Sequence, residues 1–136
     1  MKMIIGGKEL NIKFGYKATL KERVISKVVK FSKVSEQKDE KNMENIEDLL
    51  LYLPEFLLVG LQVNHKEYRY NVDTGEGKEK QLEKTFALIE EHMNNDDADV
   101  MDIFNGLQEA LTEDSFLSSL FRKEQKANAV EDAVQK

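Results

Sequence analysis

The chain contains no cysteine, no tryptophan, a single proline and only two histidines among its 136 residues. Without cysteine it can form neither a disulfide nor a thiolate metal site, and this composition is typical of a reducing compartment. His65 and His92 lie far apart and match no zinc-binding or catalytic spacing. No GxSxG nucleophile motif is present either. We therefore expect no cofactor, no metal site and no enzymatic activity.

Two short stretches resemble ligand-binding motifs only in part. Residues 75–78 (GEGK) match the end of a phosphate-binding loop, but Val72 stands where its first glycine belongs and Glu79 where its Ser or Thr belongs. The acidic residues between 96 and 102 lack the central glycine and final glutamate of a calcium loop. Helix capping explains these acids better than calcium binding does.

One more stretch, residues 65–70 (HKEYRY), interleaves basic and aromatic side chains as single-strand binders do. The patch is small and the chain carries a net charge of -6, so we expect no nucleic-acid partner.

The longest apolar stretch is Leu49 to Val63, in which eleven of fifteen residues are apolar. A membrane span needs about 20 apolar residues, and this stretch also contains Pro54, Glu55 and Gln62, so we expect no membrane segment. Its apolar residues occur all round a helix. Two interpretations stay open: a central core helix, or a helix shared between the core and a partner. The first ten residues lack the apolar region of a secretion signal.

Residues 1–14 predict a β-hairpin, because apolar and other residues alternate there. A two-residue turn at Gly7-Lys8 pairs Ile5 with Leu10 and Met3 with Ile12, and it suits a type II′ turn. A turn at Gly6-Gly7 pairs Ile5 with Lys8 instead. We favour the first register.

The following residues predict helices. Residues 19–34 have helical spacing and a capping residue at their start. Residues 35–43 have almost no apolar side chains and predict an exposed, mobile loop. The next helix is expected to be capped by Asn42 or Asn45, and Pro54 predicts two short helices or one kinked helix.

Two amphipathic helices are expected in the second half, at about residues 78–94 and from Val100 onward, with a short last helix after Ser115. The first carries an apolar stripe of Leu82, Phe86, Ile89 and Met93, and the second one of Val100, Ile103, Phe104, Leu107 and Leu111. The chain therefore predicts an α+β, mostly α-helical fold, with a short N-terminal β-hairpin packed on about five helices. We expect residues 1–122 to form a single domain and residues 123–136 a flexible charged tail.

Charge is distributed unevenly. Residues 1–33 carry nine basic and two acidic side chains, a net of +7, which leaves -13 for the remainder. Between Thr85 and Phe121 there are nine acidic residues and no Lys or Arg. This pattern suits either a solvated acidic face or a surface that selects a basic partner. The two regions could also attract each other, either within one chain or between copies, and attraction between copies would favour a homo-oligomer.

Three segments together resemble a known family: Ile5 to Gly15 (IGGKELNIKFG), Leu49 to Leu61 around its Leu-Pro, and Asp114 to Phe121 (DSFLSSLF) before a charged tail. In order and size they resemble the tail assembly chaperones of long-tailed, siphovirus-type phages of Gram-positive bacteria. Such proteins are not enzymes. They bind and solubilise the phage tape measure protein in the cytoplasm of the infected host, help recruit tail tube subunits, and are absent from the mature virion. Many also occur in a longer, frameshifted form that contacts the major tail tube protein.

A chaperone for a helical tape measure protein needs exposed apolar surface, and two segments are the candidates. The candidate partner-binding residues are Phe56, Leu57, Leu58 and Leu61 in the first segment, and Phe116, Leu117, Leu120 and Phe121 in the second. Two alternatives remain: a structural tail or connector protein of the virion, and an acidic inhibitor of a host enzyme, which the uncompensated acidic residues would suit.

Overall fold

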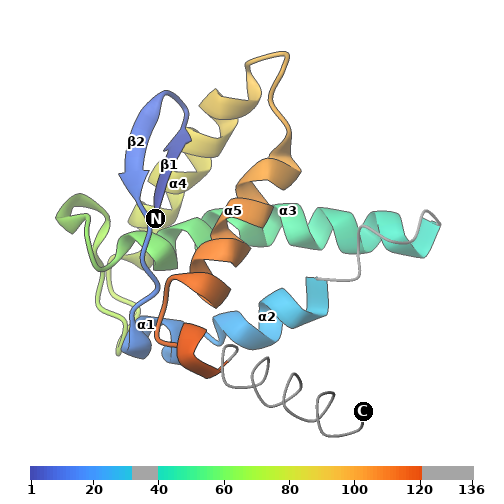
Figure 1. The fold of residues 1–136 in the computed structure, drawn as a ribbon. Coiled ribbons are helices and arrows are strands. Elements are labelled where there is room, and N and C mark those ends of the chain that lie inside the picture. The colour runs from blue at the N-terminus through green and yellow to red at the C-terminus, as the bar shows by residue number, and fades with distance from the viewer. Residues whose placement is uncertain (32–39, 121–136) are drawn as a thin grey trace, which may run out of the picture.

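The computed structural model describes residues 1–31 and 40–120, and it confirms a mostly helical α+β fold. A two-stranded antiparallel hairpin opens the chain and lies beside α4 (Figure 1). The elements are β1 (Lys2–Ile5), β2 (Lys8–Asn11), α1 (Tyr16–Lys21), α2 (Val24–Phe31), α3 (Glu40–Leu61), the short 3-10 helix η2 (Lys66–Tyr68), α4 (Lys78–Met93) and α5 (Val100–Glu113).

The hairpin forms in the register that we did not favour. Ile5 pairs with Lys8 and Met3 with Leu10, so the turn residues are Gly6 and Gly7. Both glycines have positive φ, 61° and 75°, as a type I′ turn requires at its two central positions. The two registers differ by two residues and bury the same apolar face, so the alternation could not separate them. The conformational freedom of the two glycines decides between them.

The helix predicted over residues 19–34 is two helices, α1 and α2. They are separated at Arg23, whose φ of 54° is left-handed and ends the first helix. Thr19 is not a cap; it is buried inside α1, where its N–H donates to the carbonyl of Gly15. Residues 32–34 lie outside the described residues.

The third helix is longer than predicted. It begins at Glu40, so the loop expected over residues 35–43 is wrong for its last four residues, while residues 35–39 lie outside the described part. Asn42 and Asn45 lie within the helix and do not cap it. Pro54 does not divide it into two helices, because one helix continues past the proline to Leu61 (Figure 1).

The second half of α3 lies at the centre of the core. Helices α2, α4 and α5 contact it, and the chain that follows β2 crosses it. That crossing is close: the N–H of Lys13 donates to the carbonyl of Gly60 at 2.9 Å. A Cβ at Gly60 would lie 2.9 Å from the side chain of Ile12 and 3.1 Å from that of Phe14, so only glycine fits here without rearrangement.

Both histidines hold the hairpin in place. His92 Nδ1 accepts a hydrogen bond of 3.1 Å from the N–H of Gly6, and His65 Nε2 accepts one of 3.0 Å from the N–H of Asn11. The two bonds fix opposite ends of the hairpin, to α4 and to the loop after α3. Since a lone hairpin is marginal in water, such attachments are what make it stable.

The two amphipathic helices form where the sequence places them, as α4 and α5. The acidic break between them supplies a cap, because the Asp99 carboxylate accepts from the N–H of Met101 at 2.9 Å. Among the described residues, no group of three or more His, Cys, Asp or Glu side chains is placed to hold a metal ion. No described helix combines the length and hydropathy that crossing a membrane requires.

We expect Gly6→Ala to destabilise the fold more than Gly7→Ala. Both positions have left-handed φ, which costs an alanine about 1–2 kcal/mol. A Cβ at Gly6 would also lie 2.8 Å from the Leu88 carbonyl oxygen, whereas nothing lies within 4 Å of a Cβ at Gly7. The clash should add roughly 1–3 kcal/mol. Urea unfolding of both variants measures the difference, and equal losses would contradict the observed packing of the turn on α4.

Candidate partner-binding groove

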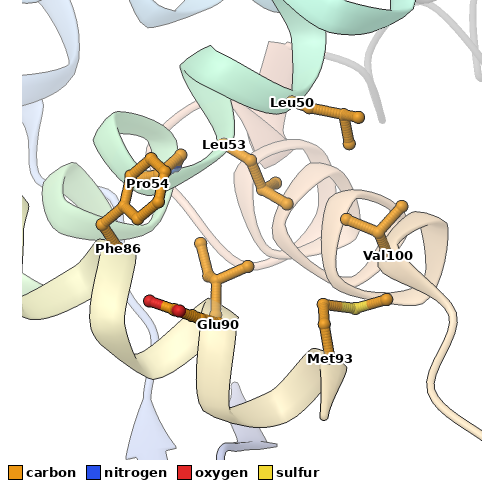
Figure 2. Close-up of a pocket in the computed structure, with 8 residues that line it drawn as sticks. Leu50, Leu53, Pro54, Phe86, Glu90, Met93 and Val100 are labelled. Carbon is orange, nitrogen blue, oxygen red and sulfur yellow. The ribbon is translucent and has the colours of Figure 1, made fainter. Parts of the chain in front are cut away.

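An apolar groove of about 440 Å³ lies between α3 and α4, and Val100 at the start of α5 also lines it. Figure 2 shows side chains of all three helices around it. Its lining residues are Leu50, Leu53, Pro54, Phe86, Ile89, Glu90, Met93 and Val100. All except Glu90 are apolar.

The groove exists because only part of the α4 apolar stripe is covered. Phe86 is 52 % exposed and Met93 38 % exposed, although both belong to the stripe that predicted an amphipathic helix. On the opposite wall, Leu50 is also 38 % exposed. Thr85 is the fully buried residue of α4. The two helices are therefore tightly packed at Thr85, and the stripe beyond it remains open to solvent.

Two polar contacts fix the place where α3 and α4 meet. The Thr85 hydroxyl donates to the Pro54 carbonyl at 3.0 Å, and it lies within 3.1 Å of the Leu82 carbonyl. At the start of α4, the Lys78 ammonium donates to Glu55 at 2.9 Å and to Glu22. Both contacts therefore join α3 to the first half of α4, on the Pro54 side of the groove.

Glu55 is shared between two lysines, since the ammonium of Lys27 also donates to it at 3.2 Å. Burial favours the neutral acid, but the hydrogen bond and charge of Lys78, followed by those of Lys27, hold the pKa of Glu55 below its usual range. Burial likewise opposes the charge of Lys78, and the hydrogen bonds that it donates to Glu22 and Glu55 raise its pKa. Glu55 and Lys78 are therefore charged at neutral pH, and their contacts with Glu22 and Lys27 join the end of α1 to α2, α3 and α4.

The walls of the groove are negative. Residues 42–65, which include the exposed part of α3, contain no Lys or Arg, and neither do residues 85–120. Glu90 lines the groove, Glu83 lies one turn before Phe86, and Glu47 lies one turn before Leu50. All three are exposed, and none forms an ion pair within the described part of the chain. A basic partner would meet uncompensated carboxylates here.

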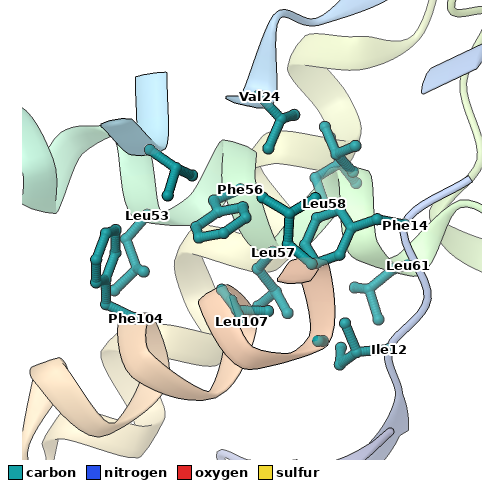
Figure 3. Close-up of a cluster of buried hydrophobic side chains, with 14 of the residues drawn as sticks. Ile12, Phe14, Val24, Leu53, Phe56, Leu57, Leu58, Leu61, Phe104 and Leu107 are labelled. Atoms are coloured by element: carbon teal, nitrogen blue, oxygen red, sulfur yellow. The ribbon is translucent and has the colours of Figure 1, made fainter. Parts of the chain in front are cut away.

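The first set of predicted site residues lies in the core. Phe56, Leu57, Leu58 and Leu61 are fully buried, and Figure 3 shows them among side chains of the neighbouring elements. Phe56 contacts the rings of Phe14 and Phe104, with centroids 5.2 and 5.8 Å away. A partner cannot reach these four residues in this conformation. Of the two interpretations of the segment, the core helix holds for its second half.

The members of the second set of predicted site residues differ in their exposure to solvent. Leu117 is buried, Phe116 is half-buried against the exposed ring of Tyr16 at 5.1 Å, and Leu120 is 60 % exposed. Phe121 lies outside the described residues. Leu120 is therefore the member of this set that the structure leaves accessible.

Sequence reasoning did not select the groove. Its residues were present in two patterns, the stripe of α4 and the all-round apolar surface of α3, but both patterns are also typical of core helices. The sequence does not indicate the point along α3 at which its packing against α4 ends, and this point decides which apolar residues stay exposed. Comparisons with protein families, with curated proteins and with solved structures found no match to this chain.

We expect Glu55→Gln to lower the free energy of unfolding at neutral pH by about 1–3 kcal/mol, because it weakens the charged hydrogen bonds from Lys78 and Lys27. The pKa of Glu55 is lower in the folded chain than the unfolded value of about 4.3, so its contribution is present above that pH and lost as pH falls further. The difference between the two proteins should therefore shrink on acidification. Urea unfolding across the acidic range measures it, and a difference independent of pH would contradict the charged cluster.

Proposed function

We propose that this protein is a non-enzymatic assembly chaperone that binds and solubilises a phage tail tape measure protein. The resemblance of three chain segments to tail assembly chaperones supports the proposal. The observation that carries it is the groove, in which apolar side chains of α3 and α4 remain exposed between acidic walls. Exposed apolar patches of this kind, bordered by polar residues, are typical of protein-binding sites.

The groove suits the task of a chaperone for a long helical protein. A tape measure protein that is not yet surrounded by tail tube exposes apolar helical stripes, which aggregate if they are left in water. The groove would cover such a stripe, while the acidic surface around it would keep the complex soluble. The proposal includes recruitment of tail tube subunits, action in the cytoplasm of the infected host, and absence from the mature virion.

The acidic surface is also compatible with one alternative function, an acidic inhibitor of a host enzyme. The groove favours the chaperone proposal, because a mimic of a polyanion would present carboxylates rather than an apolar channel. A structural tail or connector protein, the other alternative, would be found in purified particles. Mass spectrometry of purified virions separates that function from a chaperone's.

We expect co-expression with the tape measure protein of the same genome to keep that protein soluble and to allow both to be purified together. Phe86→Ser/Met93→Ser should reduce the recovered complex by at least roughly tenfold, since it removes two partly exposed apolar contacts worth about 1 kcal/mol or more each. Ile4→Ser/Leu51→Ser is the matched control, because both residues are exposed and neither lines the groove. The control should bind as the unmodified protein does.

Leu120→Ser tests the second candidate surface in the same assay. If it abolishes co-purification while the groove variant does not, the partner-binding site lies at the end of the described chain and not in the groove. An insoluble and unbound tape measure protein beside a folded partner would contradict the proposed function itself.

A further inference from the structure

The α3 wall of the groove continues beyond the groove. Met43, Ile46, Leu50 and Leu53 are spaced at i, i+3, i+7 and i+10, which places them on one face of the helix. Met43 and Leu50 are exposed and Ile46 is partly exposed. From the first to the last, this face is roughly 15 Å long, at 1.5 Å per residue. On the opposite wall, Phe86, Ile89 and Met93 form a second face of roughly 10 Å.

These two faces fit an α-helix better than an extended peptide. A helix presents apolar side chains at i, i+3, i+4 and i+7 along one stripe, and helix-in-groove recognition uses such anchors. A stripe of about ten residues, or three turns, matches the length of the α3 face. An extended strand would need a free sheet edge beside it, and the lining of the groove consists of helical residues together with Val100 at the start of α5.

The negative charge of the groove walls indicates which residues should flank the apolar stripe of the bound helix. Glu47 borders the α3 face, and Glu83 and Glu90 border the α4 face, so carboxylates lie on both sides of the apolar channel. Glu47 and Glu90 lie in segments, residues 42–65 and 85–120, that contain no Lys or Arg, whereas Glu83 precedes the second segment and has Lys80 one turn before it. A helix with Lys or Arg on either side of its apolar stripe would form charge pairs along both walls. Acidic flanks would be repelled.

A second copy of the chain offers a poorer fit. In a symmetric dimer the same groove would face itself, and Glu83 and Glu90 of one copy would approach the same carboxylates of the other. Like charges held together at an interface oppose association.

We propose that the groove between α3 and α4 binds an amphipathic helix of about three turns whose apolar stripe is flanked by Lys or Arg. The observations that carry it are the two apolar faces, the carboxylates that border them without an ion pair among the described residues, and the absence of Lys and Arg from residues 42–65 and 85–120. It deepens the proposed function, on which it rests only in taking the groove as the partner site. The helix would be a segment of the tape measure protein, recognised by charge as well as by apolar shape.

Two synthetic helical peptides of about 18 residues test the ligand class, with the same leucine stripe and either Lys or Glu at the flanking positions. Fluorescence anisotropy with labelled peptides measures binding to the full chain. The Lys peptide should bind at least roughly tenfold more tightly than the Glu peptide at low salt. This preference should decrease as salt is raised from about 0.1 to 1 M. Equal binding of the two peptides would overturn the proposal.

Glu83→Gln/Glu90→Gln locates the interaction. We expect about a threefold to tenfold loss of affinity for the Lys peptide, as two exposed ion pairs would give. Glu109→Gln/Glu113→Gln is the matched control, because it removes the same charge from exposed positions on the far half of α5. Equal losses in the two variants would show a long-range effect of net charge, and would overturn a binding site in the groove.

The remaining outcomes separate the inference from the proposed function. If the Lys peptide binds in the groove but the tape measure protein does not, the ligand class stands and the chaperone function fails. If the tape measure protein binds and neither peptide does, the chaperone function stands and the proposed ligand class is wrong. Sedimentation velocity of the protein without peptide measures self-association. We expect no self-association through the groove, that is, none that the Phe86→Ser substitution would abolish. If such association is found, a second copy occupies the groove and the proposal is wrong.

Discussion

The second half of α3 is apolar on every side, and both the core and the groove follow from this property. Its residues cannot be exposed without cost, so α2, α4, α5 and the chain after β2 pack around it. The covering is complete from Phe56 to Leu61, where every residue is buried. Nearly two turns earlier, at Leu50, the covering is incomplete, because this residue is 38 % exposed. The boundary between the covered and the open part of α3 lies near the hydrogen bond that the Thr85 hydroxyl donates to the Pro54 carbonyl.

Polar contacts at both ends of α4 contribute to that boundary. Apolar packing is non-directional and would favour an α4 that lies along the whole of α3. Lys78, held by Glu22 and Glu55, fixes the start of α4, and His92 fixes its end to the turn of the hairpin. Between these two points α4 cannot tilt to close the groove without breaking hydrogen bonds. The open apolar surface is thus a consequence of directional contacts at both ends of one helix.

Much of the fold was predictable, because local signals and the final structure agree in the second half of the chain. The stripes of α4 and α5 and the acidic cap before α5 are such signals. The errors have physical causes. Two registers of the hairpin bury the same face, so only the positive φ of Gly6 and Gly7 separates them. The left-handed Arg23 that divides α1 from α2 has no counterpart in sequence patterns, since only about a few per cent of non-glycine residues adopt positive φ.

The candidate site was less predictable than the fold. Phe56 and Leu61 were selected because they are apolar, and for the same reason they are in the core. Which apolar residues remain exposed depends on the angle between two helices, and that angle depends on contacts between residues far apart in the chain. The proposed function depends on the groove being the partner-binding site. Hydrogen exchange of this protein alone and in complex with the tape measure protein tests it most directly. Binding in the groove should slow exchange in residues 43–54 and 85–100. Protection confined to other segments would contradict it.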